Sequence, residues 1–338
     1  MLNRRQFIIG AGAVLATATG CSRVRMKLPA SGESIQAEGE GPQPFRVALL
    51  SDPHIVESDS LVAVAVNGKF SRAVAEYKPL RPDLWVVNGD IADTGKAGQL
   101  AAFKQIMGGV ARPEQLLVTT GNHEFYDKAA SDDEELTRFR EAFGLKTPYS
   151  SRVAGGIHLV MLADEQYKTA PKNREWAWLT PEQLRWFEQV LAEHRDKFTV
   201  VCMHQPLQET VYWSHGDNDF AGCGQFTELQ GILSRNPQIR LWFSGHTHMG
   251  AAIAGNASRR DGVAFVGLGS TFYQYAPSDA PEDKGDWPDG RGFRQDLGAS
   301  ESRLLEVWPD RVVLRARDHA RQRWLAPQEI TIDRSRTA

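Results

Sequence analysis

Five short polar segments of the chain carry residue types that bind metal ions or move protons, and each follows an apolar run. They are Asp52-Pro53-His54, Gly89-Asp90, Gly121-Asn122-His123, His204-Gln205 and Gly245-His246-Thr247-His248. Taken singly, each has a simpler explanation, because Asp and Asn often cap helices or form turns and a histidine can be a satisfied core residue. Taken together they hold five of the nine histidines, which indicates one shared site.

The spacing inside these segments suits metal binding. Asp52 and His54 are two residues apart, so in an extended segment their side chains point to the same side, with Cβ atoms about 6 to 7 Å apart. The same holds for His246 and His248. Asp90 follows a buried apolar run, and ligands of open α/β sheets gather beyond the carboxyl ends of strands. Imidazole, carboxylate and amide oxygen without sulfur form the ligand set of hard or borderline divalent ions.

The elements that must position these residues are strands alternating with helices. Apolar runs predict strands at residues 46–50, 84–88, 116–119, 157–163, 199–203, 239–244, 263–268, 304–308 and 312–316. Helical patterns lie at residues 70–77, 99–107, 132–143, 181–194 and 225–233. This alternation predicts an α/β fold with helices covering sheet layers, and the strand-rich last third predicts a second sheet packed on the first.

The five segments, in this order, resemble the calcineurin-like metallophosphoesterase superfamily, with a match from about residue 45 to residue 250. The resemblance implies a four-layer α/β/β/α sandwich of two mixed β-sheets flanked by helices. It also implies two divalent metal ions, of Mn, Fe or Zn. One ion would be held by Asp52, His54, Asp90 and His248. The other would be held by Asp90, Asn122, His204 and His246, with Asp90 bridging the two.

The same resemblance implies hydrolysis of phosphate esters by a hydroxide that bridges the metals. Phosphodiesters are favoured over phosphomonoesters as substrates. His123 would be a catalytic general acid, and Asp93 would orient its neighbours. Asp93 stands where purple acid phosphatases carry a metal-binding tyrosine, which disfavours that branch. Two alternatives stay open: a non-catalytic metal-binding scaffold of the same fold and a protein phosphatase. His123 favours the enzyme, because a scaffold has no need of an imidazole that binds no metal.

The amino terminus predicts export. Arg4-Arg5-Gln6-Phe7 before an uncharged run resembles a twin-arginine signal, so residues 1–20 are expected to be a signal peptide. Residues 21–44 carry Pro, Gly, Ser and Glu and predict a flexible tether before a metallophosphoesterase domain at 45–338. The cysteine at the start of the tether, Cys21, lies in a sequence similar to a lipoprotein box. The domain is therefore expected in the periplasm or lipid-anchored to a bacterial membrane.

The amino-acid composition limits the kinds of partner that the protein is expected to bind. A net charge of −3, with 41% hydrophobic and 24% charged residues, is typical of a soluble globular enzyme and indicates no nucleic-acid-binding face. Three cysteines exclude a disulfide framework and a Cys-rich zinc module. The expected partner is a small phosphate ester. Aromatic residues in loops near the site either stack on such a substrate or only pack those loops; they are Trp176, Trp178, Tyr212, Trp213, Tyr273 and Tyr275.

Overall fold

The protein is described from a computed structural model, which describes residues 43–57, 61–214, 220–280, 283 and 292–334. The predicted signal peptide at 1–20 and nearly all of the predicted tether at 21–44 lie outside the described residues. Among the described residues, no helix combines the length and the apolar character needed to span a membrane.

The first sheet is mixed and has the strand order β14-β13-β12-β1-β2-β3, with β15 also paired to β13. Its strands are β1 (Phe45–Leu50), β2 (Leu84–Asn88), β3 (Leu116–Thr119), β12 (Glu301–Val307), β13 (Arg311–Asp318), β14 (Arg323–Trp324) and β15 (Ile330–Asp333). β1, β2 and β3 run parallel, whereas β12 pairs antiparallel to β1. The carboxyl ends of the three parallel strands therefore meet at one edge.

The second sheet is also mixed, with the order β4-β5-β6-β7-β9-β8. Its strands are β4 (Ser150–Ala154), β5 (Ile157–Leu162), β6 (Phe198–Met203), β7 (Ile239–Ser244), β8 (Ala257–Arg260) and β9 (Val263–Gly267). The four central strands are parallel, and the two outer strands are antiparallel to their neighbours. A separate hairpin joins β10 (Gln274–Ser278) to β11 (Gly292–Asp296).

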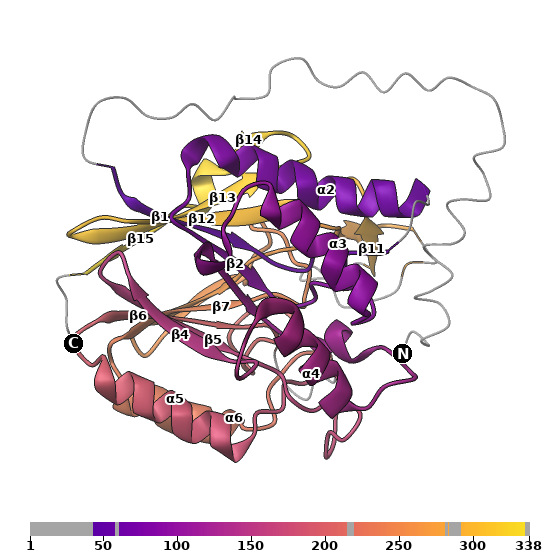
Figure 1. Cartoon of the computed structure of the whole chain (residues 1–338). Coiled ribbons are helices and arrows are strands. Elements are labelled where there is room, and N and C mark those ends of the chain that lie inside the picture. The colour runs from indigo at the N-terminus through magenta and orange to yellow at the C-terminus, as the bar shows by residue number, and fades with distance from the viewer. Residues whose placement is uncertain (1–42, 58–60, 215–219, 281–282, 284–291, 335–338) are drawn as a thin grey trace. The chain divides into compact units, whose positions relative to one another are not determined.

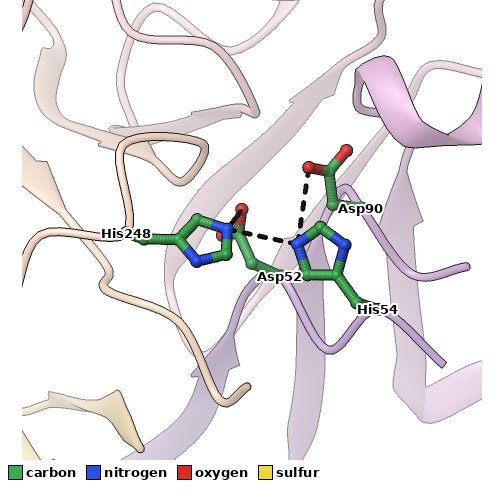
Figure 2. A group of neighbouring side chains, drawn as sticks. All are labelled: Asp52, His54, Asp90 and His248. Carbon is green, nitrogen blue, oxygen red and sulfur yellow. Dashed lines mark hydrogen bonds and ion pairs between the residues drawn. The ribbon is translucent and has the colours of Figure 1, made fainter. Parts of the chain in front are cut away.

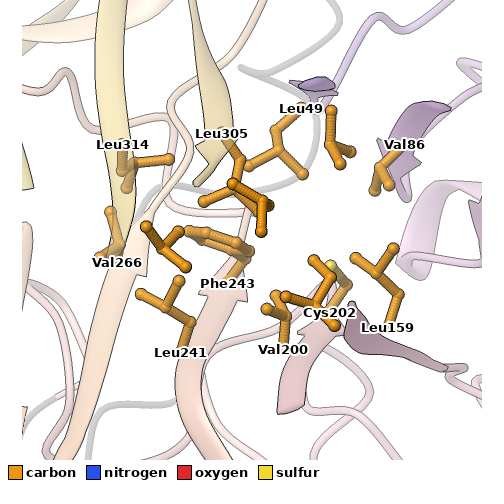
Figure 3. Close-up of a cluster of buried hydrophobic side chains, with 14 of the residues drawn as sticks. Leu49, Val86, Leu159, Val200, Cys202, Leu241, Phe243, Val266, Leu305 and Leu314 are labelled. Atoms are coloured by element: carbon orange, nitrogen blue, oxygen red, sulfur yellow. The ribbon is translucent and has the colours of Figure 1, made fainter. Parts of the chain in front are cut away.

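The two sheets pack face to face over an apolar core. Side chains from both sheets meet there, including Leu49, Val86, Leu159, Phe243 and Leu305 (Figure 3). Alternate strand residues such as Ala48 and Val87 point the other way, toward the helices.

Helices cover the outer face of each sheet (Figure 1). The first sheet packs against α2 (Leu61–Tyr77), α3 (Ala97–Gly108) and α4 (Asp132–Phe143). The second packs against α5 (Pro181–Glu193) and α6 (Phe226–Arg235). Short 3-10 turns lie at Lys78–Leu80, Pro113–Gln115, Asn122–Phe125 and Ala326–Gln328. The predicted four-layer α/β/β/α architecture is confirmed.

The differences from the sequence prediction lie at the margins. The strands β4, β8, β10, β11, β14 and β15 were not predicted. They are short, and β4 and β8 are partly exposed edge strands without a buried apolar run. The helix expected to start at residue 70 begins at Leu61. Its first turns were missed because they are rich in valine, which has no strong helix preference, and include Gly68.

We expect the inter-sheet core to dominate stability. Leu305→Ala should lower the free energy of unfolding by about 2 to 5 kcal/mol, because Leu305 is fully buried between the sheets. Leu297→Ala is the matched control, since Leu297 is 39% exposed and its removal should cost about 0.5 kcal/mol or less. Urea unfolding of both variants measures the difference. Equal losses would contradict the assignment of the core.

Candidate metal centre

The five predicted segments meet at one place, beyond the carboxyl ends of strands from both sheets. Asp52 and His54 follow β1, Asp90 follows β2, and Asn122 and His123 follow β3. From the second sheet, His204 follows β6, and His246 and His248 follow β7. The site is therefore built across the two sheets.

The backbone of this site is unusual. Asp52, His54, Asp90, His246 and His248 have φ values of 51°, 47°, 48°, 65° and 50°. The left-handed region is disfavoured for residues other than glycine, so it persists only where surrounding contacts impose it. The expectation that Asp52 and His54, and likewise His246 and His248, lie in extended segments is therefore wrong.

Backbone hydrogen bonds between loops hold that conformation. The amide of Asp52 donates to the Gly89 carbonyl (3.2 Å), and the amide of His54 donates to the Asp90 carbonyl (3.0 Å). The left-handed turns direct the side chains of the β1 and β2 loops to a common point without an extended backbone.

One group of ligand atoms comprises Asp52, His54, Asp90 and His248 (Figure 2). The His248 Nε2 atom lies 3.0 Å from Asp52 Oδ1 and 3.1 Å from His54 Nε2. The His54 Nε2 atom is 3.8 Å from Asp90 Oδ2. All four side chains are buried, and their ligand atoms lie within 4.8 Å of one another.

A second group comprises Asp90, His204 and His246. His204 Nε2 lies 3.1 Å from Asp90 Oδ2. The Asn122 Oδ1 atom joins this group, because it is 2.9 Å from His246 Nδ1. Asp90 is the member that both groups share.

Hydrogen bonds to backbone carbonyls fix which nitrogen of these histidines carries the proton. His204 Nδ1 faces the Asn88 carbonyl (2.7 Å), His248 Nδ1 that of Tyr273 (3.2 Å) and His246 Nε2 that of Phe220 (2.6 Å). A carbonyl oxygen only accepts, so these nitrogens carry the hydrogen of the neutral ring. The other nitrogen of each ring then presents a lone pair to the centre.

Those lone pairs face oxygen atoms that also carry lone pairs. His246 Nδ1 meets Asn122 Oδ1, and an unprotonated His204 Nε2 meets the Asp90 carboxylate. Within the described residues, the buried Asp52 Oδ2 has no hydrogen-bond partner. Nitrogen and oxygen atoms that turn their lone pairs toward one another repel unless a cation lies among them. These residues therefore fit two divalent ions.

The ionisation of the centre agrees with this fit. Burial alone would raise the pKa of Asp90, but His204 and His123 outweigh it and hold that pKa well below its usual value. Burial lowers the pKa of His204, whereas the carboxylates of Asp90 and Asp52 raise it to about 10. With no ion bound, a proton shared between His204 and the carboxylates balances their charge, and a bound cation would take its place.

His123 and Asp93 lie beside the first group and form with His54 a third group of possible ligand atoms. The ring of His123 packs edge-on against that of His54, with centroids 4.4 Å apart. His123 Nδ1 donates to the Asp93 carbonyl (2.8 Å), while the Asp93 carboxylate lies 3.9 Å away and is 41% exposed. The main chain of Asp93 therefore orients His123, and the Nε2 atom of His123 remains for a ligand.

Sequence reasoning gave no role to Glu124, which holds the loops together. Its buried carboxylate accepts hydrogen bonds from the amides of Asp90 (3.0 Å), Ala92 (3.0 Å) and Gly121 (2.7 Å). Burial, followed by the charge of Asp90, raises the pKa of Glu124 to about 7. An acidic residue directly after Asn122-His123 was the available signal.

The aromatic loops separate into two kinds. Tyr273 and Tyr275 border the centre, with ring centroids 4.1 and 6.3 Å from that of His248. Phe220, which was not predicted, stacks on His246 at 4.7 Å. Trp178 is buried, and its indole N–H donates to the Asn173 carbonyl (2.7 Å), so it packs its own loop.

Comparison with known proteins agrees with this site. Residues 45–250 match the family described as calcineurin-like phosphoesterase. The chain is 28% identical over 206 residues to the glycerophosphodiester phosphodiesterase GpdQ of Enterobacter lignolyticus, covering 60% of this chain and 70% of the relative. It is 24% identical over 241 residues to the 3',5'-cyclic adenosine monophosphate phosphodiesterase CpdA of Escherichia coli K12, covering 69% and 78%.

The fold also resembles that of a solved structure, a dimetal phosphatase from Danio rerio. The TM-score is 0.58 at 14% identity, covering 86% of this chain and 99% of that one. At this identity, the likeness concerns the fold alone.

The predicted enzyme class is confirmed, because these curated relatives are phosphodiesterases and this chain groups the His and Asp side chains that metal-dependent hydrolysis needs. The protein is a metal-dependent phosphoesterase. Since the family match spans residues 45–250 of 338, the chain belongs to the calcineurin-like phosphoesterase family.

Proposed function

We propose that this protein hydrolyses small phosphodiesters at a centre of two divalent ions. The observation that carries the proposal is that Asp90 belongs to both groups of ligand atoms. A single carboxylate shared by two groups of imidazoles would hold two cations close together. The diester preference is supported by the relatives, which are named for glycerophosphodiesters and a cyclic nucleotide.

The proposed ligands divide between the two ions. Asp52, His54, Asp90 and His248 would hold one, and Asp90, Asn122, His204 and His246 the other. When bound, the ions supply Lewis-acid chemistry, which makes water nucleophilic near neutral pH and offsets the phosphoryl charge. Nitrogen and oxygen ligands without thiolate suit Mn, Fe or Zn.

The remaining residues act on the substrate side. His123 is placed to give a proton to the leaving oxygen through Nε2, because Nδ1 is bound to the Asp93 carbonyl. Tyr273 and Tyr275 offer aromatic surface next to His248, where the organic part of a small diester can pack.

We expect Asp90→Asn to lose both activity and metal. Removing the shared charge leaves two cations without their common carboxylate, so hydrolysis of a nitrophenyl diester should fall by about 10² or more. Elemental analysis should show fewer than two ions per chain. The control is Asp133→Asn, an exposed aspartate in α4, which should behave as the wild type. A fully active wild-type protein with at most one ion would refute the dinuclear centre.

We expect His123→Ala to separate two classes of substrate. A basic alkoxide needs a proton to leave, and positioned proton donation is worth about 10² to 10⁴-fold. A nitrophenolate leaves without that help. The variant should therefore slow much more on alkyl diesters than on nitrophenyl diesters while both ions stay bound. The same loss on both substrates would show that His123 positions substrate or stabilises charge instead.

We also propose export by the twin-arginine route, with the domain in the periplasm or anchored through a lipid on Cys21. The proposal is supported by Arg4-Arg5 before an uncharged run, in a segment outside the described residues. A metal-loaded enzyme is a suitable cargo for a route that carries folded proteins.

Replacing Arg4 and Arg5 by Lys should hold the protein in the cytoplasm, because the route reads the arginine pair rather than its charge. Cell fractionation measures how the protein is distributed between cytoplasm, periplasm and membrane. An exported protein in the soluble periplasmic fraction is the free form, and one in the membrane fraction is the lipid-anchored form. Replacing Arg23 and Arg25 by Lys is the matched control. Unchanged export of the first variant would exclude this route.

A further inference from the structure

The amide of Asn122 makes different contacts on its two sides. Its Oδ1 atom faces His246 Nδ1 at 2.9 Å, on the side of the second group of ligand atoms. Its Nδ2 atom donates to the Tyr126 hydroxyl (2.8 Å) and to Glu175 Oε2 (3.1 Å). The Tyr126 hydroxyl in turn donates to the same Glu175 oxygen (3.2 Å). Each hydrogen of the amide nitrogen thus has an acceptor.

This arrangement determines which end of the amide faces the centre. A carboxylate only accepts hydrogen bonds, so it must face the NH₂ end of Asn122. A flipped amide would put Oδ1 against the Glu175 carboxylate and would turn N–H groups toward a place that needs a cation ligand. Tyr126 alone does not decide, because a hydroxyl both donates and accepts.

We infer that Glu175 is a positioning residue that holds the Asn122 oxygen toward the second metal ion and so sets the affinity for that ion. The inference rests on the proposed dinuclear function. Glu175 lies outside the five segments, in the loop between β5 and α5, and belongs to neither group of ligand atoms.

The position of Glu175 is defined by its own loop. Its amide donates to Asn173 Oδ1 (3.0 Å), and the Tyr167 hydroxyl donates to its Oε1 atom (3.4 Å). Two residues later, the amide of Ala177 donates to the Gly222 carbonyl (2.9 Å). Gly222 lies two residues from Phe220, whose carbonyl accepts from His246 Nε2.

The loop that carries Glu175 is therefore anchored to the segment that orients His246. Asn122 and His246 are two proposed ligands of the second ion. The loops that orient them are therefore hydrogen-bonded to each other. The contact that carries this inference runs through Asn122, whose oxygen faces His246 in the second group, so the second ion is the one expected to depend on Glu175.

The test is Mn²⁺ binding to the metal-stripped full chain. Isothermal titration calorimetry measures the binding, and the electron paramagnetic resonance signal measures the free Mn²⁺. Glu175→Ala should weaken the second ion by about 10- to 100-fold, as expected for a partner that orients a ligand, and leave the first ion unchanged. Glu175→Gln keeps an oxygen acceptor and should recover much of the lost affinity. Glu182→Ala, at an exposed position in α5, removes the same charge elsewhere and should bind as the wild type.

A double-mutant comparison shows whether the effect passes through Asn122. In an Asn122→Ala background, Glu175→Ala should cause little further loss, because no amide remains to be oriented. Wild-type affinity in Glu175→Ala, or an equal loss with and without Asn122, would overturn the inference. Fewer than two ions bound to the wild type would instead refute the dinuclear centre itself.

Discussion

The Asp90 carboxylate is the point on which the rest of the structure depends. It lies where two groups of ligand atoms meet, and it is buried, so its charge must be balanced inside the protein. The surrounding histidines are oriented by backbone carbonyls so that their lone pairs also face inward. A cluster of this kind is stable only with a positive charge among its members, and its raised His204 pKa reports the same need.

The fold makes such a cluster possible by placing strand ends from both sheets at one edge. Each loop then turns sharply, with left-handed backbone at residues such as Asp52 and His246. Such conformations cost about 1 to 3 kcal/mol each, and they persist where the surrounding structure over-determines them. Here the support comes from contacts between loops, such as the Asp52 amide that donates to the Gly89 carbonyl and the three amides that donate to Glu124.

The sequence predicted the layers and the ligand segments because both rest on local patterns. Buried strands such as β2 read as uninterrupted apolar runs, and a polar residue such as Asp90 stands out directly after one. Edge strands such as β4 lack that pattern. The extended backbone expected for Asp52 and His54 was wrong because the loop contacts that impose left-handed φ angles are made with residues distant in the chain, such as Gly89.

The same reason explains why the supporting residues were missed. A carboxylate in a long loop, such as Glu175, carries no spacing signal, and only the folded chain shows that it lies against Asn122.

Metal binding also has a consequence for the stability of the fold. Because the proposed ligands come from both sheets and their partners from the loops between, bound ions would tie β1 to β7 and β2 to β6. An ion that binds only the assembled site stabilises the folded state, so the ions would offset part of the backbone strain that positions their own ligands.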